Sequence, residues 1–322
     1  MNYFITGGSG FIGTHLTNLL KEVSPHCSIY NLDIVENNQN GKVTYIHCDV
    51  RKPINLADVV ITADDIIFNF AAVHRTPGHP DHAYFETNIQ GAENVCSFAE
   101  KYGIKKIVFT SSIAPYGAAE DLKEETTIPA PNTPYGISKL VAEKIHMIWQ
   151  AKSQLERQLI IVRPGVVFGK GENGNFTRLY QGIHSRKFIY PGRKDTVKAC
   201  IYVKELVRFM LYRLEHHDQG VELYNCTFEP AYTIEHIVGT MIKVTGLKRT
   251  IPLISTWILL PAAAVIGCLG APLGICPARV KKLMISTNIC GKKLVSSGYI
   301  FHYSFEEAIK DWFQDNNNLY LK

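Results

Sequence analysis

Two side chains with the chemistry of a proton-transfer site lie one helical turn apart near the middle of the chain. Tyr135 and Lys139 open a stretch, 135–151, with a helical pattern, so both side chains lie on one face of the predicted helix. A phenol has a pKa of about 10 and needs help to accept a proton at neutral pH, and a neighbouring ammonium favours the phenolate. Ser112 ends a predicted strand, where its hydroxyl can hold a substrate hydroxyl or carbonyl. These three residues are the predicted catalytic groups.

A glycine-rich turn near the N-terminus predicts a dinucleotide site. Its three glycines follow an apolar strand and open a helix, so the backbone can approach a pyrophosphate at the helix N-terminus. Asp33 ends the next strand, where its carboxylate can accept a hydrogen bond from a ribose 2′-hydroxyl and repel a 2′-phosphate. We therefore expect NAD rather than NADP. The predicted contacts in this motif are Gly7, Gly10, Phe11, Ile12, Gly13 and Asp33.

Two further positions extend the predicted cofactor site. Asp49 and Val50 follow the third strand, where they can border the adenine, with a helix cap as the alternative for Asp49. The nicotinamide ring carries a positive charge and favours the phenolate of Tyr135, as the ammonium of Lys139 does. Tyr135 and Lys139 are therefore expected to contact the cofactor as well as the substrate.

Alternating strands and helices must position these groups. Apolar strands are expected at 3–5, 28–32, 43–46, 66–70, 106–110 and 159–162, and helices at 81–102 and 135–151. This order predicts an α/β fold, a doubly wound parallel (Rossmann) sheet. Beyond residue 168 the alternation fades. We expect an NAD-binding domain at 1–168 and a smaller substrate-binding domain at 169–322, with a return of parts of 198–226 to the first domain left open.

Composition and charge exclude several classes of protein. The chain has 322 residues, 46% of them hydrophobic and 20% charged, which excludes a disordered chain or a disulfide-stapled miniprotein. A net charge of +5 is too small to indicate nucleic acid, but acidic groups prevail in 1–168 and basic groups in 169–322. The eight cysteines show no C-x-x-C spacing, so we expect no metal site and a reducing compartment. With no secretory signal, we expect a cytoplasmic protein.

One uncharged segment leaves the relation to membranes open. Residues 250–278 carry no charge and are flanked by lysine and arginine, and the stretch 236–303 has no acidic residue. The segment exceeds the roughly 20 residues that span a bilayer, but prolines and glycines divide it into short pieces. A membrane-touching helical hairpin at the inner face of the cell membrane, a true span and an ordinary buried or dimer-forming segment are the three alternatives.

Several motifs together resemble the extended short-chain dehydrogenase/reductases, the nucleotide-sugar epimerase and dehydratase group. The motifs cover nearly the whole chain and stand at 6–13, 69–72, 111–117 and 135–139. The resemblance implies that Ser112, Tyr135 and Lys139 are the catalytic serine, base and lysine. It further implies a homodimer formed through a helix pair. It also assigns contacts along the cofactor to Ala71 and Ala72, and a position beside the nicotinamide to Arg163–Pro164 and Phe168–Gly169.

The resemblance also suggests substrate contacts. Lys198 stands where the family carries a phosphate-binding arginine, so it keeps the charge but loses the bidentate fork. Asn175 is a candidate contact to a substrate amide, or else a turn residue. The stretches 71–75, 84–91, 174–175 and 278–282 are similar to members that act on sugars linked to polyprenyl diphosphate. We expect His74 and Arg75 of this chain to face the substrate, with a salt-bridged loop arginine as the alternative.

The expected function is therefore that of an NAD-dependent sugar C4-epimerase. The expected sugars are of the N-acetylglucosamine and N-acetylgalactosamine type on a diphosphate carrier, polyprenyl (undecaprenyl) diphosphate, in surface polysaccharide (O-antigen, lipopolysaccharide) biosynthesis. A UDP-sugar 4-epimerase, a 4-ketosugar reductase, a sterol dehydrogenase and a catalytically silent NAD-binding sensor remain alternatives. A 4,6-dehydratase is disfavoured, because Ser112-Ile113-Ala114 stands where that group resembles Thr-Asp-Glu. Pro115 and the loop 76–80 depart from the family pattern and leave the substrate open.

Overall fold

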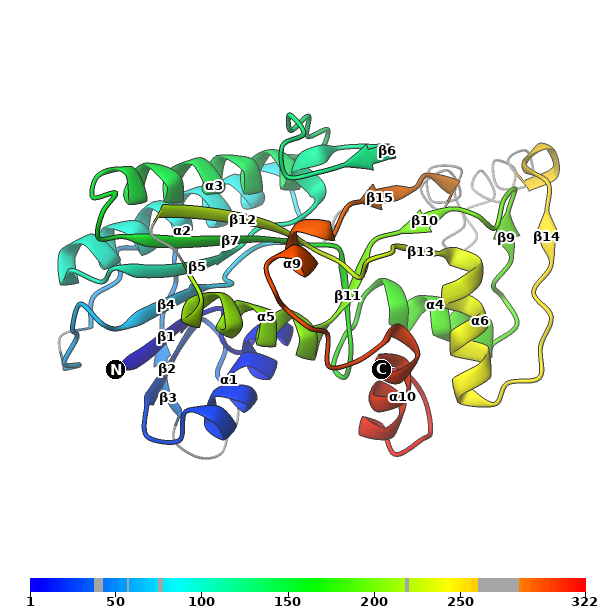
Figure 1. Cartoon of the computed structure of the whole chain (residues 1–322), viewed down its shortest axis with the longest axis horizontal. Helices are drawn as coiled ribbons and strands as arrows, with labels where there is room; N and C mark the ends of the chain where they lie inside the picture. The colour runs from blue at the N-terminus through cyan, green and yellow to red at the C-terminus, as the bar shows by residue number, and fades with distance from the viewer. Residues whose placement is uncertain (38–42, 57, 75–77, 218–219, 260–283) are drawn as a thin grey trace.

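A seven-stranded parallel sheet forms the centre of one half of the molecule (Figure 1). The computed structural model describes residues 1–37, 43–56, 58–74, 78–217, 220–259 and 284–322. The sheet has the order β12-β7-β5-β4-β1-β2-β3, and each adjacent pair is parallel. Its strands are β1 (Asn2–Thr6), β2 (Ser28–Asp33), β3 (Val43–His47), β4 (Ile66–Asn69), β5 (Lys106–Thr110), β7 (Gln158–Pro164) and β12 (Gly220–Cys226).

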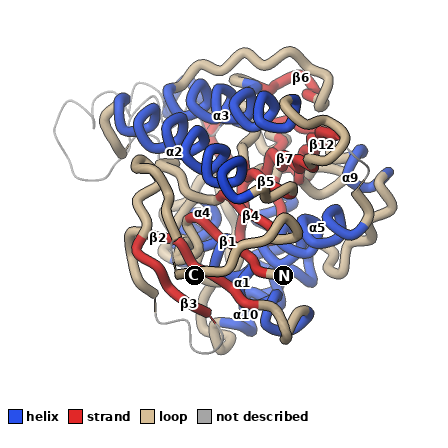
Figure 2. Tube along the Cα trace, turned by 90° about the vertical axis from the view of Figure 1, so that its left-hand side faces the viewer, coloured by secondary structure: helices blue, strands red, loops and turns tan. Residues whose placement is uncertain are grey.

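Helices cover both faces of this sheet, which confirms the predicted doubly wound fold. Figure 2 shows α2 (Asp81–Tyr102) and α3 (Pro134–Ala151) side by side over one face. The opposite face carries α1 (Phe11–Val23) and α5 (Val203–Glu215). Successive strand residues supply the two cores, because side chains of a strand alternate between faces. Phe4 packs in the core under α2 and α3, and Ile5 in the core under α1 and α5.

The chain reverses its direction of winding between β1 and β4, which are neighbours in the sheet. Thr6 and Asn69, at the carboxyl ends of these strands, are paired in register. Ligands of doubly wound sheets bind at such a switch point, in the crevice outside the strand ends. The glycine turn that follows Thr6 therefore lies at the position where a dinucleotide is expected.

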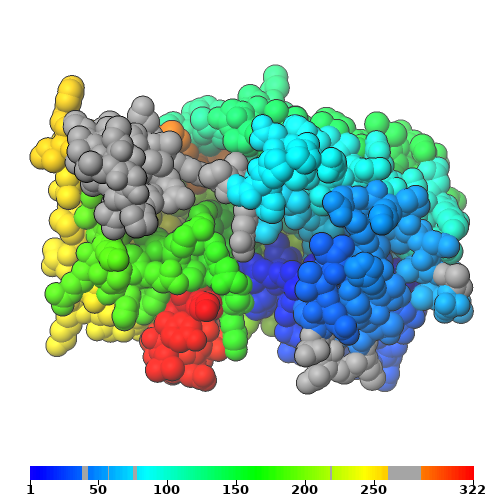
Figure 3. Space-filling model, turned by 180° about the vertical axis from the view of Figure 1, so that it is seen from behind, coloured from blue at the N-terminus to red at the C-terminus, as the bar shows by residue number. Residues whose placement is uncertain are grey.

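The other half of the molecule is built from shorter elements around a third apolar core. In Figure 3 the yellow and red segments of this half lie on the left and the blue N-terminal segments on the right. This half contains a four-stranded sheet with the order β13-β10-β15-β6. It also contains two separate two-stranded sheets, β8–β11 and β9–β14. Phe168, Phe228 and Trp312 are among the buried aromatic residues of this core. The elements are η1 (Ala114–Tyr116), β6 (Ala119–Lys123), β8 (Val166–Phe168), α4 (Asn175–His184), β9 (Tyr190–Pro191), β10 (Val197–Lys198), β11 (Cys200–Tyr202), β13 (Tyr232–Thr233), α6 (Ile234–Thr245), β14 (Leu253–Ile254), β15 (Thr287–Ile289), α9 (Lys292–Ser296) and α10 (Phe305–Asp315).

The uncharged segment 250–278 lies largely outside the described residues, which stop at 259 and resume at 284. Two residues in the described part of this segment are well exposed, Trp257 at 88% and Ile258 at 67% of their full accessible surface. In the part of the chain that the structure describes, no helix has the length and apolar character needed to cross a membrane.

Candidate active site

The catalytic pair predicted from its spacing lies in the first two turns of α3. The Thr133 hydroxyl caps this helix by accepting a hydrogen bond from the Gly136 N–H, and Pro134 occupies the first turn, where no backbone donor is needed. Tyr135 and Lys139 follow one turn apart. The cap thereby sets where the helix begins and so fixes the place of both side chains relative to the sheet.

Lys139 reaches from α3 to the carboxyl end of β5. Its ammonium donates a hydrogen bond of 2.8 Å to the Thr110 carbonyl oxygen and lies 4.9 Å from the centre of the Phe109 ring. The side chain is buried, and burial lowers the pKa of this ammonium to about 7, while the Glu143 carboxylate acts in the opposite direction. The lysine is therefore held beside the strand end that carries the catalytic serine, in a setting where its charge is sensitive to its neighbours.

Ser112 and Tyr135 meet across the gap between β5 and α3. Burial raises the pKa of the Tyr135 phenol, and a hydrogen bond with Ser112 opposes that rise. The Ser112 hydroxyl also accepts a hydrogen bond of 3.1 Å from the Ala114 N–H. Tyr84 of α2 lies on the other side, with its ring 6.3 Å from that of Tyr135. The structure thus brings the serine, tyrosine and lysine together.

The glycine turn and the loop after β4 form a narrow backbone cradle. Gly7 has a φ of +71°, and a Cβ at this position would lie 2.7 Å from the Ala71 nitrogen. Gly10 caps α1 without a side-chain hydrogen bond, so the amides of the first turn, at Phe11 and Ile12, face outward from the helix end toward an anion. A pyrophosphate fits this cradle because backbone N–H groups line it and side chains are excluded. Ala71 and Ala72 lie in the loop after β4, separated from the strand by Phe70.

Asp33 completes the cradle at the end of β2. One carboxylate oxygen accepts a hydrogen bond of 3.0 Å from the Ser9 N–H, and the other accepts one of 3.1 Å from the Val35 N–H. These bonds hold the carboxylate beside the glycine turn, and its remaining lone pairs can accept from ribose hydroxyls. The arrangement fits NAD, because a 2′-phosphate here would face a carboxylate.

The structure assigns different surroundings to the two expected adenine neighbours. Asp49 pairs with Arg51 at 2.7 Å, and the hydrogen bond from this guanidinium lowers the pKa of the Asp49 carboxyl. Val50 is buried and packs against Gly91 of α2, while its carbonyl oxygen accepts a hydrogen bond of 2.8 Å from Asn94. The Val50 side chain therefore belongs to the core and holds the backbone in place beside α2.

The expected substrate residues are spread over both halves. His74 is exposed at the end of the loop that follows β4, and Arg75 lies outside the described residues. Asn175 is exposed as the first residue of α4, and its side-chain oxygen accepts a hydrogen bond of 3.1 Å from Arg178. The roles of His74 and Asn175 in binding the substrate therefore remain predictions.

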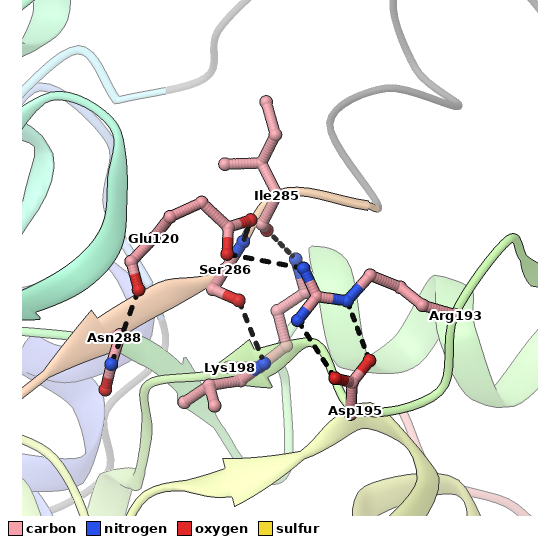
Figure 4. Close-up of polar contacts among 8 residues, drawn as sticks. Glu120, Arg193, Asp195, Lys198, Ile285, Ser286 and Asn288 are labelled. Carbon is pink, nitrogen blue, oxygen red and sulfur yellow. Dashed lines mark hydrogen bonds and ion pairs between the residues drawn. The ribbon is translucent and has the colours of Figure 1, made fainter.

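Lys198 lies in a polar cluster between β10, β15 and β6 (Figure 4). Its ammonium donates a hydrogen bond of 2.6 Å to the Ile285 carbonyl oxygen. A second cation, Arg193, is close by and forms ion pairs with Asp195 at 2.7 Å and Glu120 at 3.4 Å. Arg193 was not predicted, because its loop has no pattern that marks it. The structure gathers two cations here, on the half of the molecule that lacks the dinucleotide cradle.

Asn88 is a further residue that was not predicted at the site. Its buried amide donates hydrogen bonds to the Ser138 hydroxyl at 2.8 Å and to the Val73 carbonyl oxygen at 3.1 Å, and it accepts one from the Val73 N–H. Ser138 in turn donates to the Tyr135 carbonyl oxygen. Asn88 therefore fastens the loop after β4 to the first turn of the catalytic helix. An amide on the apolar face of 81–102 was the available signal in the sequence.

The fold and this site define an NAD-dependent enzyme with a serine–tyrosine–lysine triad. Residues 3–227 match the model of the NAD dependent epimerase/dehydratase family, so the chain belongs to that family. The chain is 32% identical over 316 residues to N-acetyl-alpha-D-glucosaminyl-diphospho-ditrans,octacis-undecaprenol 4-epimerase of Escherichia coli O157:H7, covering 96% of this chain and 93% of the relative. It is 30% identical to UDP-glucose 4-epimerase 3 of Oryza sativa subsp. japonica, covering 95% and 87%.

Solved structures share the fold over the whole chain. The structure of MoeE5 in complex with UDP-glucuronic acid and NAD has a TM-score of 0.75 at 21% identity, covering 98% of this chain and 100% of that one. The structure of UDP-N-acetylglucosamine 4-epimerase from Bacillus cereus has a TM-score of 0.73 at 18% identity, covering 98% of both chains. The protein is thus an NAD-dependent sugar 4-epimerase of the extended short-chain dehydrogenase/reductase family.

The residues of the triad divide the chemistry among them. When bound, NAD supplies the acceptor and donor of the hydride at the sugar C4. In the roles expected of them, Tyr135 as phenolate would remove the proton of the 4-hydroxyl and later return it, Ser112 would hold the sugar oxygen by a hydrogen bond, and the Lys139 ammonium would favour the phenolate. Lys139 is buried and Tyr135 is partly buried, so a charge on one acts on the other more strongly than it would in water.

Proposed function

We propose that the protein interconverts N-acetylglucosamine and N-acetylgalactosamine on polyprenyl diphosphate, as a step in the assembly of a surface polysaccharide. The observation that carries this proposal is the similarity to the E. coli undecaprenol-linked 4-epimerase, which extends over 96% of this chain and 93% of that relative. A similarity that includes the second half of the molecule supports a common type of substrate, because that half supplies the residues expected to bind it.

The charge and surface of the second half support a lipid-linked diphosphate. Lys198 and Arg193 are two cations in one cluster, and a diphosphate bound there would compete with the carboxylates of Asp195 and Glu120 for Arg193. The apolar side chains of Leu253, in β14, and of Trp257 and Ile258, which follow it, are 52%, 88% and 67% exposed. Lys248, which precedes β14, is exposed as well. Exposed apolar and basic residues together are typical of a surface that rests on anionic lipid headgroups. We accordingly propose peripheral contact with the membrane.

The decisive experiment offers two substrates side by side. UDP-N-acetylglucosamine and polyprenyl-diphosphate N-acetylglucosamine in mixed micelles are incubated with the NAD-loaded protein, and the sugars released by acid are resolved by chromatography. We expect galacto product from the lipid-linked substrate at a rate at least about tenfold above that from the UDP-sugar. Equal or faster conversion of the UDP-sugar would contradict the assignment of the carrier. Tyr135→Phe serves as the inactive control.

A UDP-sugar 4-epimerase is the second candidate. The rice UDP-glucose 4-epimerase 3 covers nearly as much of this chain, at 30% identity, and this observation favours a nucleotide carrier. A substitution of Trp257 distinguishes the two candidate functions. Replacing this exposed residue by glutamate should reduce turnover of the lipid-linked sugar and co-sedimentation with anionic vesicles, and leave turnover of a UDP-sugar unchanged. An equal loss on both substrates would count against the membrane contact.

We further propose that two copies associate through α2 and α3. Ile137, Val141 and Ile148 are 40%, 37% and 60% exposed on α3, at spacings that place them on one side of the helix. Figure 2 shows that α3 and α2 lie together on the outside of the sheet. An Ile148→Glu variant should shift the mass measured by light scattering from two chains to one. An unchanged mass would contradict the helix-pair dimer.

A further inference from the structure

A buried ion pair lies directly behind the catalytic residues. Glu143 follows Lys139 by one turn of α3 and is completely buried. Arg163 of β7, also buried, holds its carboxylate with two hydrogen bonds, of 2.8 Å from Nε and 2.6 Å from Nη2. The Ser111 hydroxyl, next to Ser112, donates to the same carboxylate. Glu143 therefore links α3, the helix on which it lies together with the tyrosine and lysine, to the strand end that carries the serine.

The pair is itself anchored to the second half of the molecule. The Arg163 guanidinium lies 4.7 Å from the centre of the Tyr116 ring, and the Tyr116 hydroxyl donates a hydrogen bond of 2.8 Å to Asn225 of β12. Asn225 donates to the Cys290 carbonyl oxygen at 3.2 Å. A carboxylate held from several sides in this way has a fixed position, and a fixed charge near a reacting group acts without reorganisation.

We propose that Glu143, held by Arg163, is a positioning residue of the reaction, which fixes the Ser111–Ser112 strand end against α3 and favours the charged form of Lys139, one helical turn from Tyr135. The proposal concerns the triad alone, so it is independent of the carrier that brings the sugar.

The proton balance of the pair gives the reason. Tyr135 is a base only as a phenolate, and an ammonium at Lys139, one helical turn away, favours that form. Burial lowers the pKa of the Lys139 ammonium to about 7 and raises that of the Tyr135 phenol, so burial alone favours the neutral form. The negative charge of Glu143 favours the ammonium and thereby the phenolate.

The other charged or titratable groups around the pair do not replace this carboxylate. His146 lies one turn beyond Glu143, and burial lowers the pKa of its imidazole to about 4. Its Nδ1–H donates to the Ala142 carbonyl oxygen at 2.7 Å, so its Nε2 accepts from Asn69 at 3.2 Å, and the ring is neutral. From α2, Tyr84 raises the pKa of Tyr135 and so acts against the phenolate. From β7, Arg163 is bound to Glu143.

The test measures the ionisation of Tyr135 directly and needs no sugar. NAD-loaded protein is labelled with ¹³C at the tyrosine Cζ, and the Tyr135 signal is identified by its loss in Tyr135→Phe. Glu143→Gln keeps the shape of the side chain, and its amide oxygen can still accept from Ser111 and from Nε of Arg163, but it removes the charge and the acceptor for Nη2 of Arg163. We expect the midpoint of Tyr135 ionisation to rise by about one pH unit, with about tenfold less phenolate at a given pH below it. An unmoved midpoint would overturn the proposal.

Three variants separate this effect from a general loss of stability. Glu205→Gln removes another fully buried carboxylate, on α5, which is bonded to Tyr299 and to the Tyr303 N–H, and should leave the midpoint unchanged. Ser111→Ala keeps the charge, so it should lower turnover several-fold with the midpoint unmoved. If Glu143→Gln fails to retain NAD, Glu143→Asp must keep the midpoint while turnover falls. Wild-type turnover in both charge-preserving variants would overturn the positioning role.

Discussion

Replacing Gly7 by alanine tests whether the close approach of two backbone segments makes room for the dinucleotide. Gly7 has a φ of +71°, and an added Cβ would lie 2.7 Å from the Ala71 nitrogen and 2.9 Å from the Phe70 carbonyl carbon. Gly103, which ends α2, has the same φ of +71°, but an added Cβ there meets nothing within 4 Å. The two glycines therefore share one backbone conformation and differ in crowding.

The free-energy cost of the left-handed backbone conformation and the cost of crowding the added Cβ can be estimated separately. An L-residue in the left-handed conformation is disfavoured by about 1–2 kcal/mol, and both variants carry this term. For a chain of this size each kcal/mol lowers the melting temperature by about 2–4 °C. At Gly7 the crowding atoms belong to the backbone and cannot rotate away, so overpacking adds about 1–3 kcal/mol. Because the displaced backbone lines the cofactor cradle, we expect that added cost to weaken NAD binding by about tenfold per 1.4 kcal/mol.

The assay compares Gly7→Ala with Gly103→Ala, purified in parallel. Bound NAD is measured after denaturation, and melting is followed with and without added NAD. We expect Gly103→Ala to keep the wild-type content of NAD with a slightly lower melting temperature, and Gly7→Ala to lose most of its NAD and much of the stabilisation by added NAD. If Gly7→Ala retains NAD and melts together with Gly103→Ala, the reasoning about the cradle is refuted.

Three further outcomes are expected. Tyr135→Phe should retain NAD while turnover falls by about 10²–10⁴-fold, and near-normal turnover would exclude the phenolate as base. Lys198→Met should raise KM for the diphosphate sugar by about tenfold with little change in kcat, and an unchanged KM would remove this lysine from the binding site. Burial favours a raised pKa at Glu222, but His217 and Arg213 outweigh it and lower that pKa to about 2. The stability advantage of the wild type over Glu222→Gln should therefore be present above about pH 5 and shrink as the pH falls toward 2, as followed by acid unfolding; a constant difference would contradict it.

Six strands of the central sheet were predictable because their elements carry their own boundaries, whereas β12 was not predicted as a strand and only a return of parts of 198–226 to this domain was left open. The helix expected at 81–102 is α2, Asp81–Tyr102, since Pro80 precedes it and Gly103 ends it in a left-handed conformation. The four-stranded sheet was not predicted. Its strands are short, and β15 pairs with β6, which lies far away in the chain, so no local period marks either strand.

The site residues differ in the same way: some were predictable from neighbours in the sequence, and others depend on partners from distant elements. Tyr135 and Lys139 were identifiable because one helical turn sets their relation, whatever surrounds the helix. Asn88 and Glu143 were missed, since their roles depend on partners from other elements. Asn88 bonds to Ser138 across two packed helices, and Glu143 bonds to Ser111, which follows β5, and to Arg163 of β7.

The sequence by itself determined the class of chemistry. The glycine turn, Asp33 and the spacing of Tyr135 and Lys139 are local patterns, and each dictates its geometry through the backbone within a single turn or helix. Only the tertiary structure decided which groups shift the pKa values of Lys139 and Tyr135, and which residues surround Lys198. Burial of Lys139 lowers its pKa to about 7, and Glu143 opposes this shift. Desolvation and charge pairing arise from the packed interior, which assembles residues that are distant along the chain.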